Sequence, residues 1–249
     1  MPFIPFFPPM KPSAASAPPA IHGDSGVRQP ARTRVWDLPT RLFHWLLAAS
    51  VTGVLFTGLT GFMEWHFRLG YAVLALLLFR LLWGFVGGRW SRFAAFIYGP
   101  RSLTAYLRGR AHPDHLIGHT PLGAISVFAM LAVLAVQVAT GLMADDEIAL
   151  AGPLSHLVSG AVASWATAWH AERGKWVVAV LVGLHMLAVA YYALVRRHSL
   201  VKPMVSGDKL LGDTAAVIPS RDDARSRLMA LVLFAICTGL AIWIASLRP

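Results

Sequence analysis

The chain has 249 residues, of which 56% are hydrophobic and only 14% are charged, and its mean hydropathy is +0.58. This composition is too apolar for an ordinary soluble domain and indicates that the bilayer is its solvent. The formal net charge of +10 does not indicate a nucleic-acid-binding protein, because the Lys and Arg residues lie between long apolar runs rather than on one soluble face. The single cysteine, Cys237, excludes an intrachain disulfide and a cysteine-ligated metal cluster.

The first 33 residues are rich in proline and lack the basic start and unbroken apolar core of a signal peptide, so we expect a disordered tail there. A helix needs about 20 apolar residues to cross the hydrocarbon core. Five stretches meet this length and predict five transmembrane helices, at residues 42–62, 67–87, 121–143, 175–195 and 227–246.

The loops alternate in their content of Lys and Arg, which predicts the orientation of the helices. The tail, the loop between the second and third spans and the loop between the fourth and fifth spans are rich in arginine, whereas residues 144–174 contain only Arg173 beside Asp145, Asp146, Glu147 and Glu172. Because cytoplasmic loops are enriched in basic residues, we expect a cytoplasmic N-terminus and, after five spans, a periplasmic C-terminus. The arginine-rich segment from Trp90 should lie at the cytoplasmic interface, and residues 153–169 should form a short helix lying on the outer surface.

Five of the ten histidines lie at membrane depth: His44, His66, His119, His170 and His185. An ionisable residue in lipid is costly and faces a partner, a cavity or a cofactor. A hydrogen bond between helices would explain any one of them, but four form two layers, with His44 and His185 toward the cytoplasm and His66 and His170 toward the outside. Two histidines from different helices are what bis-imidazole ligation of a haem iron requires. At 15 residues apart, His170 and His185 separate the layers by roughly 22 Å.

Glycines and arginines accompany these histidines. Gly70, Gly123 and Gly174 each follow a histidine by four positions and could leave a groove for a flat porphyrin, although close helix packing explains small residues equally well. Arg41 and Arg80 stand where propionates of an inner haem would need cations. Positive-inside topology explains Arg41 as well, whereas Arg80 is surrounded by apolar residues and requires an anion or a strong acceptor.

The segment RVWDLPTRLFHW at residues 34–45 resembles the bacterial cytochrome b561 family, which includes the b-type cytochrome subunits of nickel-iron hydrogenases. Similar stretches are HFRLGYAVLALLLFRLLWGFVGGRWSRF, GHTPLGA, GLMADDEIALAGPLSHLVS and SLVKPMVSGDK, so the resemblance covers residues 34–209 and leaves out the tail and residues 210–249. It implies a four-helix membrane core with two non-covalent haems b, ligated by His44, His66, His170 and His185. His119 then becomes a quinone or propionate contact rather than an iron ligand. The spacing from His170 to His185 is one residue longer than is typical of the family, and His156 is the alternative outer ligand.

These observations favour a subunit of the bacterial inner membrane that transfers electrons between the quinone pool and a protein partner, such as a c-type cytochrome or a hydrogenase or dehydrogenase subunit. A stand-alone superoxide:quinone oxidoreductase is the first alternative, since the same family supports it. A haem-free transporter or assembly subunit that uses its histidines for ions or packing is the second.

Overall fold

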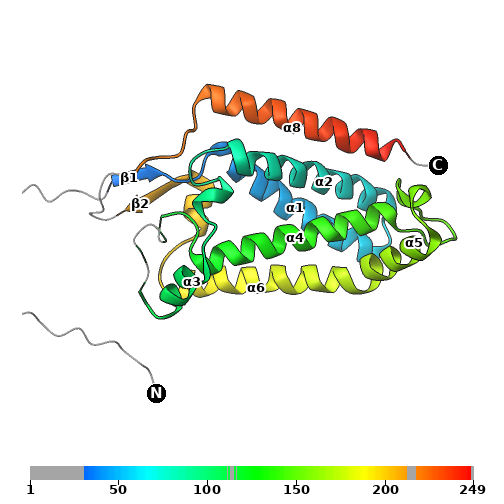
Figure 1. The fold of residues 1–249 in the computed structure, drawn as a ribbon, viewed down its shortest axis with the longest axis horizontal. Helices are drawn as coiled ribbons and strands as arrows, with labels where there is room; N and C mark the ends of the chain where they lie inside the picture. Colours follow the sequence, from blue (N-terminus) through cyan, green and yellow to red (C-terminus); the bar gives the residue numbers. More distant parts are fainter. Residues whose placement is uncertain (1–30, 111, 113–114, 116, 212–216, 248–249) are drawn as a thin grey trace, which may run out of the picture.

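The structure is a computed structural model that describes residues 31–110, 112, 115, 117–211 and 217–247. Its described part is an elongated bundle of helices (Figure 1), which confirms the predicted all-α membrane class. Five helical segments are long and apolar enough to cross a membrane, and they match the five predicted spans. Their main helices are α1 (Leu38–Thr60), α2 (Met63–Val86), α4 (Pro121–Met143), α6 (Lys175–Leu194) and α8 (Ala224–Ala245).

The two ends of the bundle differ (Figure 1). One end carries the strands β1 (Ala31–Arg34) and β2 (Asp208–Leu211) and the short elements η1 (Phe93–Ala95), α3 (Pro100–Leu107) and α7 (Val201–Ser206), and we call it the sheet end. The opposite end carries the connection after α4, with η3 (Ser155–Leu157) and α5 (Gly160–Thr167), and we call it the loop end.

Helix starts at the sheet end are set by local capping. The side chain of Asp37 accepts a hydrogen bond from Thr40 N at the start of α1, Thr120 accepts one from Gly123 N at the start of α4, and Asp223 caps α8. Such caps satisfy backbone donors that have no partner within the helix. At the loop end α1 stops at Gly61, whose φ of 79° suits glycine, and the chain turns directly into α2.

Asp37 also joins two helices. Besides Thr40 N, its buried carboxylate accepts hydrogen bonds from Gly88 N (3.1 Å), Ser91 Oγ (2.7 Å) and Trp83 Nε1 (3.3 Å) at the end of α2. A side chain at Gly88 would lie 2.3 Å from this carboxylate, so the position requires glycine. The network fixes the first turn of α1 against the last turn of α2.

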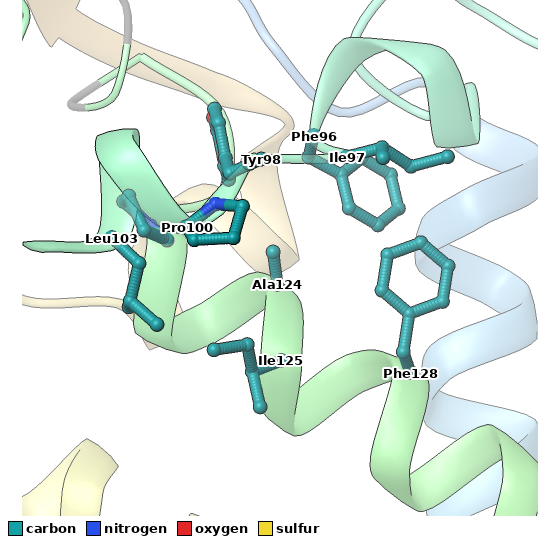
Figure 2. A pocket seen from close by; sticks show the side chains of 10 residues that line it. Phe96, Ile97, Tyr98, Pro100, Leu103, Ala124, Ile125 and Phe128 are labelled. Atoms are coloured by element: carbon teal, nitrogen blue, oxygen red, sulfur yellow. The ribbon is translucent and has the colours of Figure 1, made fainter.

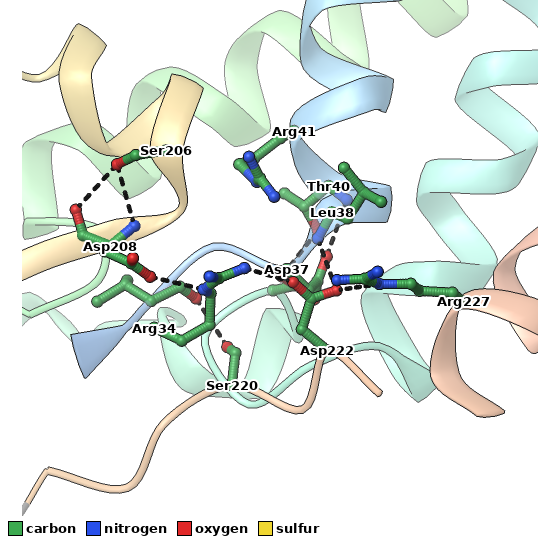
Figure 3. Close-up of polar contacts among 12 residues, drawn as sticks. Arg34, Asp37, Leu38, Thr40, Arg41, Ser206, Asp208, Ser220, Asp222 and Arg227 are labelled. Atoms are coloured by element: carbon green, nitrogen blue, oxygen red, sulfur yellow. Dashed lines mark hydrogen bonds and ion pairs between the residues drawn. The ribbon is translucent and has the colours of Figure 1, made fainter. Parts of the chain in front are cut away.

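The strands β1 and β2 pair in antiparallel fashion, from Ala31 opposite Leu211 to Arg34 opposite Asp208. Ion pairs from Arg34 to Asp208 and Asp222, each 2.6 Å, hold this sheet to the segment before α8 (Figure 3). The predicted four-helix domain spans residues 34–209, and each strand of this sheet crosses one of its two ends. Backbone pairing joins these segments, although they are distant in sequence. The rest of the expected tail, residues 1–30, lies outside the described residues.

The prediction of a separate surface helix within residues 153–169 is wrong. A short helix does form as α5, but it does not stand apart from the fourth span. It continues through a π-helical segment, η4 (Ala168–Gly174), into α6, so that Gly160–Leu194 is one long apolar span.

Apolar contacts divide the bundle into two cores. The first packs α8 on α1 and α2 through Phe43, Phe79, Trp83, Ala230 and Cys237, which explains why α8 runs beside α2 (Figure 1). The second joins α1, α2, α4 and α6 through Val51, Val73, Leu134 and Val178. These four helices carry the polar groups described next.

Candidate functional site

At the loop end, His66 in the first turn of α2 faces His170 in η4, with ring centroids 5.8 Å apart. Each ring is oriented by a backbone carbonyl of a neighbouring helix. His66 Nδ1 donates to Val54 O of α1 (3.0 Å), and His170 Nδ1 donates to Gln137 O of α4 (2.8 Å). With the proton held on Nδ1, Nε2 is left with its lone pair and can ligate a metal.

Gln137 supports this arrangement in a second way. Its side-chain Nε2 donates to His170 O (2.9 Å), a carbonyl of the π-helical segment. A π-helix pairs residue i with i+5 and takes up one extra residue per turn. Fifteen residues of a regular α-helix would leave His170 and His185 about 60° apart around its axis, and the π-helical segment changes this angle.

At the sheet end, His44 in the second turn of α1 faces His185 in α6, with ring centroids 6.4 Å apart. Neither ring has a hydrogen bond to another described residue, and His44 Nδ1 is buried without a partner. The pair is thus held by its helices alone.

Both separations suit a metal ion between the rings. Each metal–nitrogen bond is about 2 Å and each ring adds roughly half its width, so bis-imidazole ligation needs centroids about 6 Å apart. The structure therefore brings together the two pairs expected from depth. His156 stands exposed in η3 and belongs to neither pair.

Two arginines with buried, unpartnered nitrogens lie at the same end of the bundle as this pair. Arg80 is buried, its guanidinium lies 4.6 Å from the ring centre of Phe93, and its Nη1 has no hydrogen-bond partner among the described residues. Arg41 donates through Nη1 to Val205 O (2.5 Å), but its Nε is likewise buried and unpaired. Buried donors without partners are costly, so these two side chains fit an anionic group such as a haem propionate.

His119 lies between Trp36 and Phe96, with ring centroids 4.7 and 4.3 Å away, and its Nδ1 is buried without a partner. Burial, together with Arg80 and Lys209, lowers the pKa of His119 to about 3. A protonated ring there would be desolvated beside other cations, which disfavours its charged form.

The glycines have different surroundings. A side chain at Gly70 would meet nothing within 4 Å, which leaves the open space that a porphyrin needs. At Gly174 a Cβ would overlap Gln137 and Trp169, so close packing accounts for this glycine, and Gly123 is explained by its own cap at Thr120.

Sequence reasoning missed two glycines that touch the histidine rings. A Cβ at Gly141 would lie 2.6 Å from the His170 ring, and one at Gly58 would lie 3.1 Å from the His66 ring. It also missed Gln137, although a single amide within an apolar span was a visible signal. Asp37 gave a weaker signal, because a capping residue before a span is common.

An apolar cavity of about 250 Å³ lies at the sheet end between α3 and α4 (Figure 2). Phe96, Tyr98, Leu103, Ile125 and Phe128 are among its lining residues. The hydroxyl of Tyr98 donates to His119 O (2.8 Å), and the Phe96 ring lies against the His119 ring. The His119 ring does not line the cavity.

Known proteins resemble most of this chain. The family model for prokaryotic cytochrome b561 matches residues 35–207. A probable Ni/Fe-hydrogenase B-type cytochrome subunit of Azotobacter chroococcum mcd 1 is 27% identical over 226 residues, covering 77% of this chain and 94% of the relative. Proteins of the same description in Bradyrhizobium diazoefficiens (25% identity, 77% and 91% coverage) and, for hydrogenase 1, in Escherichia coli K12 (23%, 70% and 88%) are also similar.

The matched region contains α1, α2, α4 and α6 and both histidine pairs. The extent of the match excludes the haem-free alternative and shows a multi-pass membrane protein that binds haem b and takes part in electron transfer. This chain belongs to the prokaryotic cytochrome b561 family.

Proposed function

We propose that the protein holds two haems b, one between His44 and His185 and one between His66 and His170, and carries electrons across the membrane between the quinone pool and a protein partner. The observation that carries this proposal is the presence of two facing imidazole pairs, one at each end of the bundle. When bound, each haem iron supplies a one-electron carrier. The chain orients the imidazoles, supplies cations and excludes water.

The residues between the two pairs are apolar. Val51, Val73, Leu134 and Val178 form the core that joins α1, α2, α4 and α6. Such a close-packed apolar core keeps water out of the region between the two histidine pairs. The separation inferred from helix rise, roughly 22 Å, places them near opposite membrane surfaces.

The sheet end is proposed to face the cytoplasm, since the arginine-rich segments end there and the acidic segment lies at the other end. Asp146 accepts hydrogen bonds from the backbone N–H groups of Leu150, Ala149 and Ile148, which hold the pKa of its carboxyl below the usual value. The loop end therefore presents a fixed negative charge to a periplasmic partner. A hydrogenase or dehydrogenase subunit is favoured over a c-type cytochrome, because the relatives are described as hydrogenase cytochrome subunits.

The cavity between α3 and α4 is the proposed site for quinone. It is apolar and lies at the sheet end (Figure 2). Phe96, which lines it, also packs against the His119 ring. A quinone ring needs an apolar slot open to lipid and a nearby hydrogen-bonding group, which Tyr98 offers. The backbone carbonyl of His119 then orients the Tyr98 hydroxyl, and the His119 ring packs against Phe96.

Reduction by a quinol in nanodiscs tests this function. Ile125 lines the cavity and is 50% exposed, whereas Leu122 on the same helix is 48% exposed and does not line it. Ile125→Trp should fill the cavity and slow reduction by about ten-fold or more, while Leu122→Trp should leave the rate unchanged. Both variants should still bind two haems that dithionite reduces. Equal rates in all three proteins would contradict the quinone site, and a spectrum without low-spin haem b would contradict the function.

A further inference from the structure

A second cavity, of about 620 Å³, opens at the sheet end and serves neither histidine pair. Four of its lining residues are basic: Arg89 and Arg92 from the segment after α2, and His112 and His115 from the segment before α4. Trp90 and Tyr98 contribute aromatic walls. Arg89 stacks above the Trp90 ring at 5.7 Å, and Trp90 Nε1 donates to Ile218 O (3.1 Å), so the indole has a fixed position.

The described carboxylates near this end are already engaged. Asp37 accepts hydrogen bonds within the α1–α2 contact, Asp208 pairs with Arg34, and Asp222 accepts from Arg34, Arg227 and Leu38 N (Figure 3). Within the described part of the chain, Arg89 and Arg92 have no carboxylate partner. The two arginines therefore bring positive charge to the cavity that no carboxylate of the described residues balances.

One wall of the cavity carries an orphaned polar atom. Nδ1 of His115 is buried and has no hydrogen-bond partner among the described residues. A buried imidazole nitrogen and two guanidinium groups can together bind the oxygens of a phosphate, which is the anion that arginine recognises through paired N–H groups.

The position of the cavity favours the phosphate of a lipid head group over a free phosphate ion. It adjoins the ends of α2 and α4, where these spans leave the hydrocarbon, and Trp90 is a residue type that favours the level of lipid head groups. Ile117, Val217 and Ile218 add apolar surface that suits the glycerol part of a lipid better than a free ion.

We propose that this cavity binds a phosphate group, presented by the head group of an anionic membrane lipid. Bound lipid would bridge the segment after α2, the segment before α4 and residues 217–218, and would thus tie α8 to the haem-carrying helices. The proposal is independent of the proposed electron-transfer path.

Native mass spectrometry of the purified holoprotein in detergent tests it, with titrations of phosphatidylglycerol, phosphatidylcholine and inorganic phosphate. Arg89→Gln/Arg92→Gln removes the two cavity arginines. Arg101→Gln/Arg108→Gln removes the same charge from exposed positions that do not line the cavity. The first double variant should bind phosphatidylglycerol roughly 30-fold more weakly, since two arginines near a lipid surface contribute about this factor. The control should bind as the wild type does, and phosphatidylcholine should bind weakly to all three.

The single variant His115→Gln provides a second measurement that leaves both arginines in place, and it should also weaken phosphatidylglycerol binding. Binding of inorganic phosphate with the same dependence on Arg89 and Arg92, without retention of lipid, would support a phosphate site but overturn the lipid as its source. Equal losses in both double variants, or equal binding of both lipids by the wild type, would overturn the site. An unchanged haem spectrum verifies that each variant is folded.

Discussion

The two histidine pairs are alike in sequence character but differ in their support. At the loop end both rings donate to backbone carbonyls, at Val54 O and Gln137 O. At the sheet end neither ring has such a bond to a described residue, and the buried guanidinium of Arg80 lies at this end of the bundle. A carbonyl bound to Nδ1 makes the imidazole a stronger donor and favours the oxidised iron, whereas a nearby cation favours the reduced iron, which carries less positive charge. The difference predicts that a haem at the sheet end has the higher reduction potential.

Loss of one ligand should have the largest effect. His66→Ala and His44→Ala should each lower the haem content from two to one per chain, because each removes an axial ligand from only one pair. In a potentiometric titration, His66→Ala should remove the lower step and His44→Ala the upper one. The haem-to-protein ratio verifies the loss. If His66→Ala removes the upper step and His44→Ala the lower one, the haem at the loop end has the higher potential and the prediction is wrong.

Removal of one residue tests the role of the π-helical segment. Deletion of Ala171, which is exposed within η4, should convert the π turn into a regular one and keep His170 and His185 on one face, so both haems should be retained. Deletion of Val180, which lies in the regular helix α6 between the two histidines, has no such turn to absorb it. It should rotate the two rings apart by about 100° and abolish binding of at least one haem. Equal haem content in the two deletions would refute this role.

The buried cation at the sheet end sharpens the comparison further. Arg80→Gln should lower the upper potential by on the order of 60 mV, the equivalent of a ten-fold change for one electron, and leave the lower potential unchanged. Arg68→Gln is the matched control, because Arg68 is an exposed arginine on the same helix that pairs with Glu64 at the loop end. If Arg80→Gln shifts the lower potential instead, Arg80 acts on the haem at the loop end and the proposed assignment is wrong.

The smallest expected effect concerns Gln137. Gln137→Leu leaves His170 O without its donor, which should cost about 1–3 kcal/mol and lower the unfolding temperature by on the order of 5 °C. Absorption of the lower-potential haem should decay first on heating. Ser126→Ala on the same helix is the control, since among the described residues the Ser126 hydroxyl hydrogen-bonds only to the sulfur of Met130, at 3.9 Å. If the two variants melt alike, Gln137 does not position His170.

Much of the bundle could be predicted because membrane spans are encoded locally. Length and hydropathy predicted all five transmembrane segments, including the fifth, which is α8. The histidines could be assigned to layers because depth along a helix follows from counting residues. The surface helix could not be predicted correctly, because whether α5 ends or continues into α6 depends on how η4 packs against Gln137.

The sequence by itself determined the spans, the depth of each histidine and the family, since each depends on local composition or on motifs. Only the tertiary structure decided which carbonyls orient His66 and His170, why Asp37 and Gly88 belong together, and that β1 and β2 join the two ends of the matched region. These contacts link residues on different helices or far apart in the chain. Their geometry arises from packing, which the order of residues along one helix does not express.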